Sequence, residues 1–204
     1  MKRFLFLILI LVVSVQAQLP SHPIGVLSVK LEPYKLYFLG MPFDNTNAYN
    51  NIMSQLPEGS TFSSWDKSAF KYSMHKIKNG RTGNQDVQRG DGFFISTSEE
   101  ITLRLYGDVP DSTNFTKQLN RGFNMCSLPY PVDTDLSTDS LVDSLMSGSM
   151  IITWDSDAQK YTVALKTKDK WTQDEILISP EQGFWINQKI GRLVWDTSKP
   201  YVYP

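Results

Sequence analysis

Two aspartates stand directly after a tryptophan in the two halves of the chain, Asp66 after Trp65 and Asp155 after Trp154. Paired carboxylates are the machinery of glycoside hydrolysis, in which one protonates the leaving group and the other acts as nucleophile or base. A carboxylate near a strand end more often begins a turn by accepting backbone N–H groups. A secreted, glycosidase-like hydrolase is therefore an alternative function, with turn capping as the competing interpretation.

Histidine chemistry has few candidates, because His22 and His75 are the 2 histidines of the chain. Two histidines exclude most histidine-rich metal sites. We place His75 on the polar face of a strand beside Lys71 and Ser73, and its counterpart in the second half is Ala164. We expect a solvated strand histidine rather than a member of a Ser-His-Asp triad.

The stretch Asp133 to Asp139, "DTDLSTD", has carboxylates at positions 1, 3 and 7, as a calcium loop would. Position 6 is Thr138 where such a loop needs glycine, and position 12 is Ser144 where it needs a bidentate glutamate. We therefore expect a helix-capping loop with Thr138 as the N-cap, and neither a metal site nor a cofactor.

An aromatic side chain in a polar loop is the strongest candidate for binding. Trp171 lies in "KTKDKWTQDE" with Lys168 and Lys170 beside it, and it is either a lid over the edge of the core or a platform for a sugar or a protein side chain. Trp185 stands in the second half where the first half has Phe94. We expect any binding face in the second half, at Trp171, Trp185, Lys168 and Lys170.

The basic segment "KYSMHKIKNGR" offers a second kind of partner. Its lysines and arginine suit an anionic polysaccharide, but lysines on an edge strand also prevent strand-to-strand aggregation. The second interpretation is favoured.

These candidates recur because the chain repeats itself. "GDGFFIST" at residues 90–97 matches "EQGFWINQ" at residues 181–188, and "LGMPFD" matches "SLPYPVD". Gly59 aligns with Gly148, and the Trp-Asp and Lys-Tyr pairs align as well. The pattern predicts a tandem duplication, with residues 18–110 and 111–204 as the two repeats.

The hydrophobic periodicity of each repeat predicts a β-α-β-β-β-β unit. Apolar residues at Tyr49, Ile52, Met53 and Leu56 predict a short amphipathic helix, and alternating runs before and after it predict strands. In the second repeat we expect Tyr161, Val163 and Leu165 to face inward. The segment 107–121 is expected to be a linker. The fold class is β-rich α+β, with the repeats packed by pseudo-twofold symmetry.

The glycine before each aromatic pair, Gly92 or Gly183, is expected to adopt a positive φ on entering a buried strand. One aromatic of each pair is expected to face the core and the other the outside or the sister repeat.

The order Pro-aromatic, amphipathic helix, Trp-Asp, Lys-Tyr, Gly-aromatic-aromatic-Ile resembles an uncharacterised repeat of secreted and surface proteins of some environmental bacteria. The resemblance covers essentially the whole mature chain, twice. Asn124-Met125-Cys126 keeps the family's Asn at the first strand, whereas Leu36 to Leu39 lacks it. The resemblance implies export and a β-rich fold, and it assigns no reaction.

The first residues predict export. Lys2 and Arg3 precede the apolar run Phe4 to Val13, and the segment ends in Ala17, which is typical of a signal peptide over residues 1–17. Removing it leaves 18 basic against 21 acidic residues, a balance too mild to indicate nucleic acid or a membrane surface. Cys126 is the single cysteine, which excludes an intramolecular disulfide, and we expect it to be buried.

The sequence thus favours a secreted, non-catalytic interaction module of the extracellular space, periplasm or cell surface. Its expected partner is a protein of a surface assembly or a polysaccharide, without nucleic acid and without membrane insertion after signal removal. Homo-oligomerisation stays open.

Overall fold

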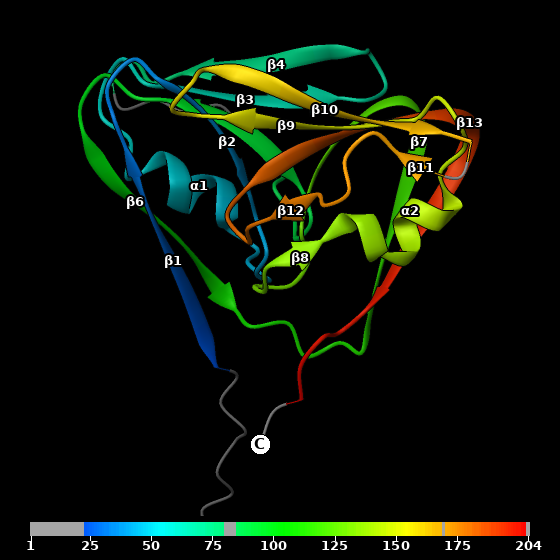
Figure 1. The fold of residues 1–204 in the computed structure, drawn as a ribbon. Coiled ribbons are helices and arrows are strands. Elements are labelled where there is room, and N and C mark those ends of the chain that lie inside the picture. Colours follow the sequence, from blue (N-terminus) through cyan, green and yellow to red (C-terminus); the bar gives the residue numbers. More distant parts are fainter. Residues whose placement is uncertain (1–22, 80–84, 169, 203–204) are drawn as a thin grey trace, which may run out of the picture.

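The computed structural model describes residues 23–79, 85–168 and 170–202. The expected signal peptide lies outside these residues. Each half of the chain builds one main antiparallel sheet, one two-stranded sheet and one short α-helix (Figure 1). The expected β-rich α+β class is confirmed.

In the part of the first half that the structure describes, there are six strands and a helix. In chain order they are β1 (Ile24–Leu31), β2 (Leu36–Gly40), α1 (Ala48–Met53), β3 (Thr61–Asp66), β4 (Lys71–Lys76), β5 (Gly92–Ser96) and β6 (Ile101–Asp108). Four of the strands form a sheet in the order β2-β5-β3-β4, and β1 pairs with β6 as a separate antiparallel ribbon.

The second half merges some of these strands into longer ones. Its elements are β7 (Asn114–Ser127), β8 (Thr134–Asp135), the 3₁₀ turn η1 (Leu136–Thr138), α2 (Ser140–Ser144), β9 (Met150–Asp155), β10 (Lys160–Thr167), β11 (Lys170–Trp171), β12 (Leu177–Ile178) and β13 (Gly183–Ser198). The main sheet has the order β11-β10-β9-β13-β7, and β12 pairs with β8.

The strand orders of the two halves correspond. β7, β13, β9 and β10 follow one another in the second sheet as β2, β5, β3 and β4 do in the first. The registers correspond too, since Trp65 pairs with Tyr72 and Trp154 with Tyr161. The duplication, its repeat boundaries and a twofold relation between the halves remain predictions.

Helix boundaries follow from burial and capping. Tyr49, Ile52 and Met53 of α1 are buried at the predicted spacing. Asp139 is the N-cap of α2, one residue after the expected Thr138, and its carboxylate accepts from the backbone N–H of Leu141. Asp135 caps η1 through Ser137 in the same way. The segment 133–139 is thus a helix-capping loop, as expected.

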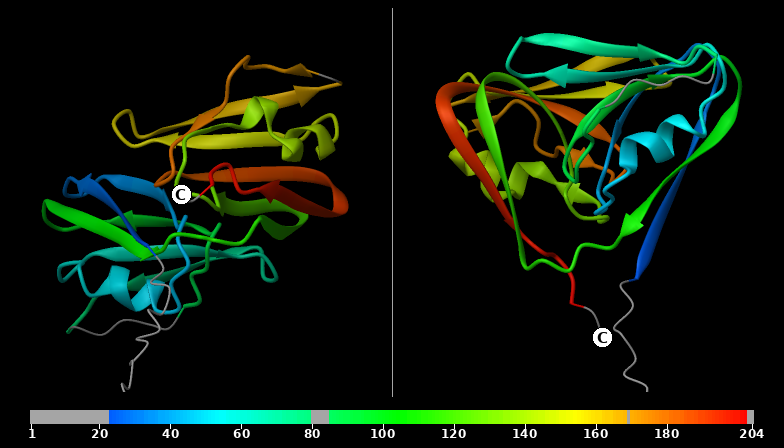
Figure 2. Two further views of the ribbon diagram at one scale, coloured as in Figure 1. Left: turned by 90° about the horizontal axis from the view of Figure 1, so that it is seen from below. Right: turned by 180° about the vertical axis from the view of Figure 1, so that it is seen from behind.

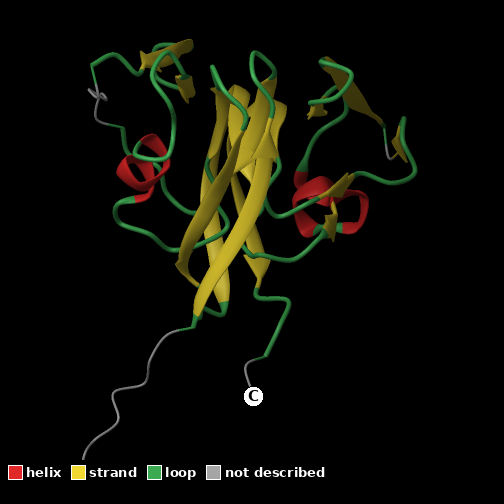
Figure 3. Cartoon of the chain, turned by 90° about the vertical axis from the view of Figure 1, so that its left-hand side faces the viewer, coloured by secondary structure: helices red, strands yellow, loops and turns green. Residues whose placement is uncertain are grey.

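The layers run helix, sheet, sheet, helix, and Figure 3 shows the two helices on opposite sides of the strands. One core lies between α1 and the first sheet and a second between α2 and the second sheet. A third lies between the sheets, formed by Phe38, Phe94, Met125, Ile152 and Trp185.

The aromatic pairs divide between these cores as expected. Phe93 and Phe184 face the helix-side cores, whereas Phe94 and Trp185 enter the core between the sheets. Cys126 is fully buried, as expected, and burial raises the pKa of its thiol to about 11.

The structure differs from the predicted linker, the predicted strands and the predicted glycine conformation. Residues 114–121 of the expected linker lie in β7, where they pair with β13. β1 was not predicted. Gly92 and Gly183 have no positive φ; they are needed for close approach, because a Cβ would lie 2.6 Å from the carbonyl oxygen of Cys126 at Gly92 and 2.5 Å from that of Leu39 at Gly183.

Candidate functional site

Trp185 lies at the centre of the molecule, not at its surface. Its side chain is 5% exposed, and its ring centroid lies 5.7 Å from Phe38 and 5.3 Å from Trp65 of the first half. A ligand at the surface does not reach it. Trp185 is therefore corrected from a binding residue to the residue that joins the two sheets.

Trp171 covers the edge of the core between α2 and the second sheet. It is partly buried against that core, and its ring lies 6.0 Å from the Lys166 ammonium. Lys166 is buried and donates to the carbonyl oxygens of Val142 and Asp143 at the end of α2. A buried lysine needs such partners, and the indole shields them from water. The lid is therefore the better description of Trp171.

Lys168 and Lys170 are exposed at the same hairpin. Lys168 has a positive φ of 51° and its backbone N–H donates to Ser147 Oγ at 3.0 Å, which makes it a turn residue. Because Trp171 packs on the helix side of the second sheet and Trp185 on its other side, the structure does not bring the four predicted binding residues together.

Asp66 and Asp155 cap hairpin turns. The Asp66 carboxylate accepts from the backbone N–H groups of Ser68 and Ala69 at 2.8 and 3.0 Å. Asp155 accepts from Asp157 and Ala158 at 3.0 and 2.9 Å. These hydrogen bonds lower both carboxyl pKa values. A glycosidase general acid needs the opposite shift.

His75 belongs to a polar network on the α1 side of the first sheet. Its Nε2 lies 3.2 Å from Ser73 Oγ, and the Gln85 amide donates to Ser73 Oγ at 2.7 Å. Its ring packs edge-on against Tyr49. The described residues place no carboxylate in hydrogen-bond contact with this imidazole, so they do not assemble the triad.

Exposed aromatic side chains gather beside the core between the two sheets, where Tyr72 and Phe123 contact Trp185. The surface there is formed by six large apolar residues, which we call the aromatic face: Phe70, Tyr72, Met74, Phe123, Tyr161 and Val163. Their exposed fractions run from 41% for Phe123 to 67% for Met74. β4 and β10 carry four of the six; β4 is the edge strand of the first sheet, and β10 lies near the edge of the second.

Three of the six residues are connected through side-chain contacts. Tyr72 and Tyr161 interact through their side chains across the two halves. Tyr72 and Phe123 both contact Trp185, with ring centroids 6.0 and 5.9 Å away. The Phe70 ring is near Gly122, directly before Phe123, because a Cβ added at Gly122 would lie 3.7 Å from Phe70 Cε1. Exposed apolar side chains that gather in one place mark interaction sites, whereas singly scattered ones do not.

The expectation that Tyr161, Val163 and Leu165 face inward was wrong. Ala164 and Lys166 are the buried residues of β10, whereas Tyr161 and Val163 are 47% and 45% exposed. The predicted alternation along β10 is correct, but the residues predicted to be buried lie on its more exposed face. The sheet has a core on each side, and the side that bears Tyr161 is only partly covered.

Burial and Tyr161 together change the acidity of Tyr72. Partial burial is the larger cause, and the charge and hydrogen bond of Tyr161 add to it, so that the pKa of Tyr72 rises from its ordinary value near 10 to about 12. Tyr72 therefore stays neutral in ordinary buffers and presents a hydroxyl group beside apolar rings.

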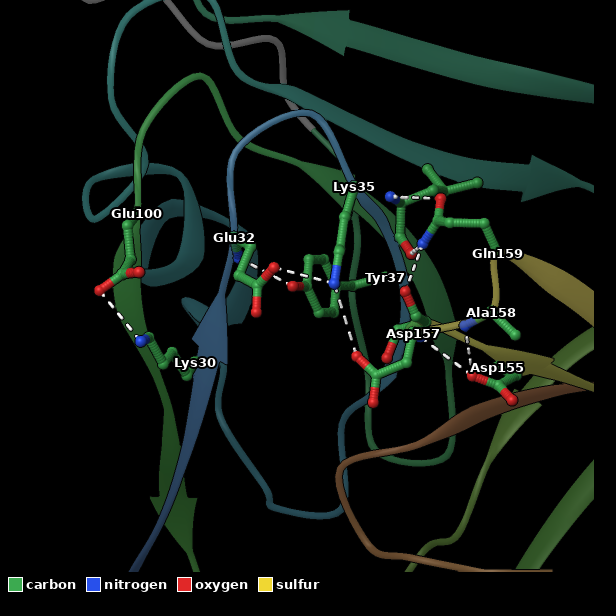
Figure 4. A network of polar contacts seen from close by, with 11 residues as sticks. Lys30, Glu32, Lys35, Tyr37, Glu100, Asp155, Asp157, Ala158 and Gln159 are labelled. Atoms are coloured by element: carbon green, nitrogen blue, oxygen red, sulfur yellow. Dashed lines mark hydrogen bonds and ion pairs between the residues drawn. The ribbon is translucent and has the colours of Figure 1, made fainter.

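The hairpin tips at the two ends of the sheet interface differ. Gln159, at φ 50°, accepts from the Leu36 backbone N–H at 3.0 Å and donates to the Leu36 carbonyl at 3.0 Å (Figure 4). Phe70 holds the matching tip position at φ 49° and is 62% exposed. A bulky residue at positive φ is strained, and here its ring faces solvent. The Phe70 end of the interface is thus open where the Gln159 end is fastened.

No group of three or more metal-ligating side chains occurs among the described residues. Within the same residues, no helix is both long and apolar enough to cross a membrane.

Comparison with known proteins gives no relative: the family models, the curated proteins and the solved structures that were searched contain no match to this chain.

Proposed function

We propose that the protein is a secreted, non-catalytic interaction module that binds a protein partner of an extracellular or cell-surface assembly through the aromatic face. The observation that carries the proposal is the exposed set of Tyr72, Met74, Tyr161 and Val163 on β4 and β10, whose two tyrosines interact across the two sheets. Such a patch stays exposed at a cost in solubility, which a partner that covers it removes.

The composition of the aromatic face favours a protein over a sugar. Tyrosine, phenylalanine and methionine are enriched at the centres of protein interfaces, and charged residues are depleted there. All six residues of the face are uncharged. A glycan site needs convergent polar groups in a concave surface, and the tyrosine hydroxyls are the polar groups that the face itself offers.

The test uses a photo-crosslinking amino acid placed at position 74 of the full chain, produced in its native host. The matched control carries the same amino acid at position 194, because Val194 of β13 is 60% exposed and lies outside the aromatic face. We expect one host protein to crosslink to position 74 and not to position 194.

The captured protein is then produced pure and titrated against the wild type and a Tyr72→Ser, Tyr161→Ser double variant. Loss of two central aromatic anchors weakens binding by about 30-fold or more. Equal crosslinking from position 194, or equal affinity for the double variant, contradicts the proposal.

A further inference from the structure

The outer edge of β7 has backbone groups that no described residue pairs. β7 is the last strand of its sheet and bonds on one side to β13. The backbone N–H of Lys199 donates to the Thr113 carbonyl at 2.7 Å, which fixes the odd-numbered residues as the hydrogen-bonded partners of β13. Thr116 and Gln118 therefore direct their N–H and C=O groups away from the sheet.

At the next outward-facing residue, Asn120, both backbone groups have a hydrogen-bond partner within the chain. The Asn124 side chain accepts from the Asn120 backbone N–H at 2.9 Å and donates to the Asn120 carbonyl at 2.8 Å. Farther along, Asp91 forms an antiparallel bridge with Cys126, and the Ser127 N–H donates to the Gly90 carbonyl at 3.0 Å. Other residues of the chain thus already bond to the outer edge of β7 at Asn120 and Ser127. The outward groups of Gln118 and Thr116 have no such partner among the described residues.

A groove runs along the unpaired stretch. Thr116 and Gln118 line a hollow of about 590 Å³, and residues 85–89 line it as well. A second hollow of about 590 Å³ continues past Thr116 to Asn114 and shares residues 86–89 with the first. The stretch Asn114–Gln118 is roughly 16 Å long at strand geometry, which is the length of five extended residues.

The charges around the groove leave one carboxylate without a cation. Arg89 pairs with Asp44 at 3.3 Å, and Lys117 pairs with Asp91 at 2.6 Å. Asp86 lines both hollows, is exposed, and accepts from the Gln88 amide at 2.6 Å, while the described residues offer it no ion pair. Lys67 and the turn-capping Asp66 also line the first hollow, and their opposite charges cancel in the sum. The groove is therefore slightly acidic at Asp86.

We propose that this groove binds an extended segment of another protein, which adds as a strand to the outer edge of β7 and places a lysine or arginine beside Asp86. An extended backbone is the group that complements a row of unpaired N–H and C=O groups, and side chains then supply specificity. The groove borders the aromatic face near Trp65 but uses other residues, so either site can bind without the other.

The test selects heptapeptides from a random displayed library on the full chain and measures their affinity by fluorescence polarisation. The variant Gln118→Pro removes one outward N–H and leaves the ladder with β13 intact, because proline is tolerated on an edge strand. The matched control is Ser28→Pro on β1, where the Val109 N–H bond to the Pro23 carbonyl fixes Ser28 as outward-facing.

We expect selected peptides to carry lysine or arginine and to bind Gln118→Pro about tenfold more weakly or worse, since a backbone hydrogen bond and its neighbour are lost. Ser28→Pro and the Tyr72→Ser, Tyr161→Ser variant should bind them as the wild type does. Asp86→Asn should weaken binding at low salt and not at high salt.

A library that enriches no peptide, or peptides that bind Gln118→Pro as tightly as the wild type, overturns the proposal. Should Gln118→Pro fail to fold by circular dichroism, hydrogen exchange on the wild type decides instead. Peptide binding must then slow exchange at the Thr116 and Gln118 amides, and unchanged exchange there contradicts strand addition.

Discussion

The indole N–H of Trp154 donates to the carbonyl oxygen of Leu36 at 2.7 Å, across the boundary between the two halves. The indole of Trp65 makes the reciprocal bond to Phe123 at 3.1 Å. Each half therefore holds the corresponding strand of the other, β2 or β7, through an indole N–H. Figure 2 shows the two halves lying side by side in the view from below.

Replacing Trp154 with Phe keeps an aromatic ring and removes this bond. We expect the free energy of unfolding to fall by about 1 kcal/mol, because the Leu36 carbonyl keeps a second donor in Gln159. Urea unfolding followed by circular dichroism measures the change. A variant as stable as the wild type would show that the indole N–H does not join the halves.

The close approach of the two halves at Gly183 predicts a larger loss of stability when a side chain is added there. A Cβ there lies 2.3 Å from Phe38 Cδ2 and 2.5 Å from the Leu39 carbonyl, so Gly183→Ala should cost about 3 kcal/mol of unfolding free energy. Gly191→Ala is the matched control on the same strand, because a Cβ at Gly191 meets nothing within 4 Å. Its effect should stay within about 0.5 kcal/mol. Equal effects of the two substitutions would contradict the packing.

The substitution Trp171→Ala distinguishes the two interpretations of this side chain, a lid over the core and a platform for a ligand. If Trp171 covers Lys166 and the core under α2, Trp171→Ala lowers the unfolding free energy by about 2 kcal/mol and leaves partner binding unchanged. Unfolding in urea and titration with the crosslinked partner measure the two effects separately. Lost binding at full stability would restore the platform interpretation.

The contact between Tyr72 and Tyr161 predicts a loss of folding stability at alkaline pH. Because the pKa of Tyr72 is raised to about 12 in the folded chain, the folded state disfavours ionisation of the phenol. This contribution to stability is fully present below the unfolded value near 10 and is lost as the pH rises through 12. Phenolate absorbance should show one late-titrating tyrosine, and Tyr161→Phe should move it to lower pH. An ordinary titration for all tyrosines would refute the contact.

Local patterns were enough to predict the strand-rich class, the helix stripe of Ile52 and Met53, and the capping loop before α2. These features depend on neighbours in sequence, where periodicity and side-chain capping act directly. The opposite burial of Phe184 and Trp185 also followed from the alternation of a strand.

Other features depend on partners far along the chain. Asn114 to Asn120 is polar apart from Phe115 and Leu119, and it is a strand because β13 pairs with it. Gly183 is fixed by the approach of Phe38 from the other half. Trp185 appeared as a binding residue because an aromatic substitution alone does not say which side of a two-sided sheet is covered.

The account depends most on which aromatic side chains solvent reaches. Hydroxyl-radical footprinting with mass spectrometry measures this directly, and it should show fast modification of Met74, Tyr72 and Tyr161 and strong protection of Trp185. Addition of the crosslinked partner should protect the first three. Oxidation of Trp185 as fast as that of Met74, in the folded protein without a partner, would contradict both the packing of the sheets and the aromatic face.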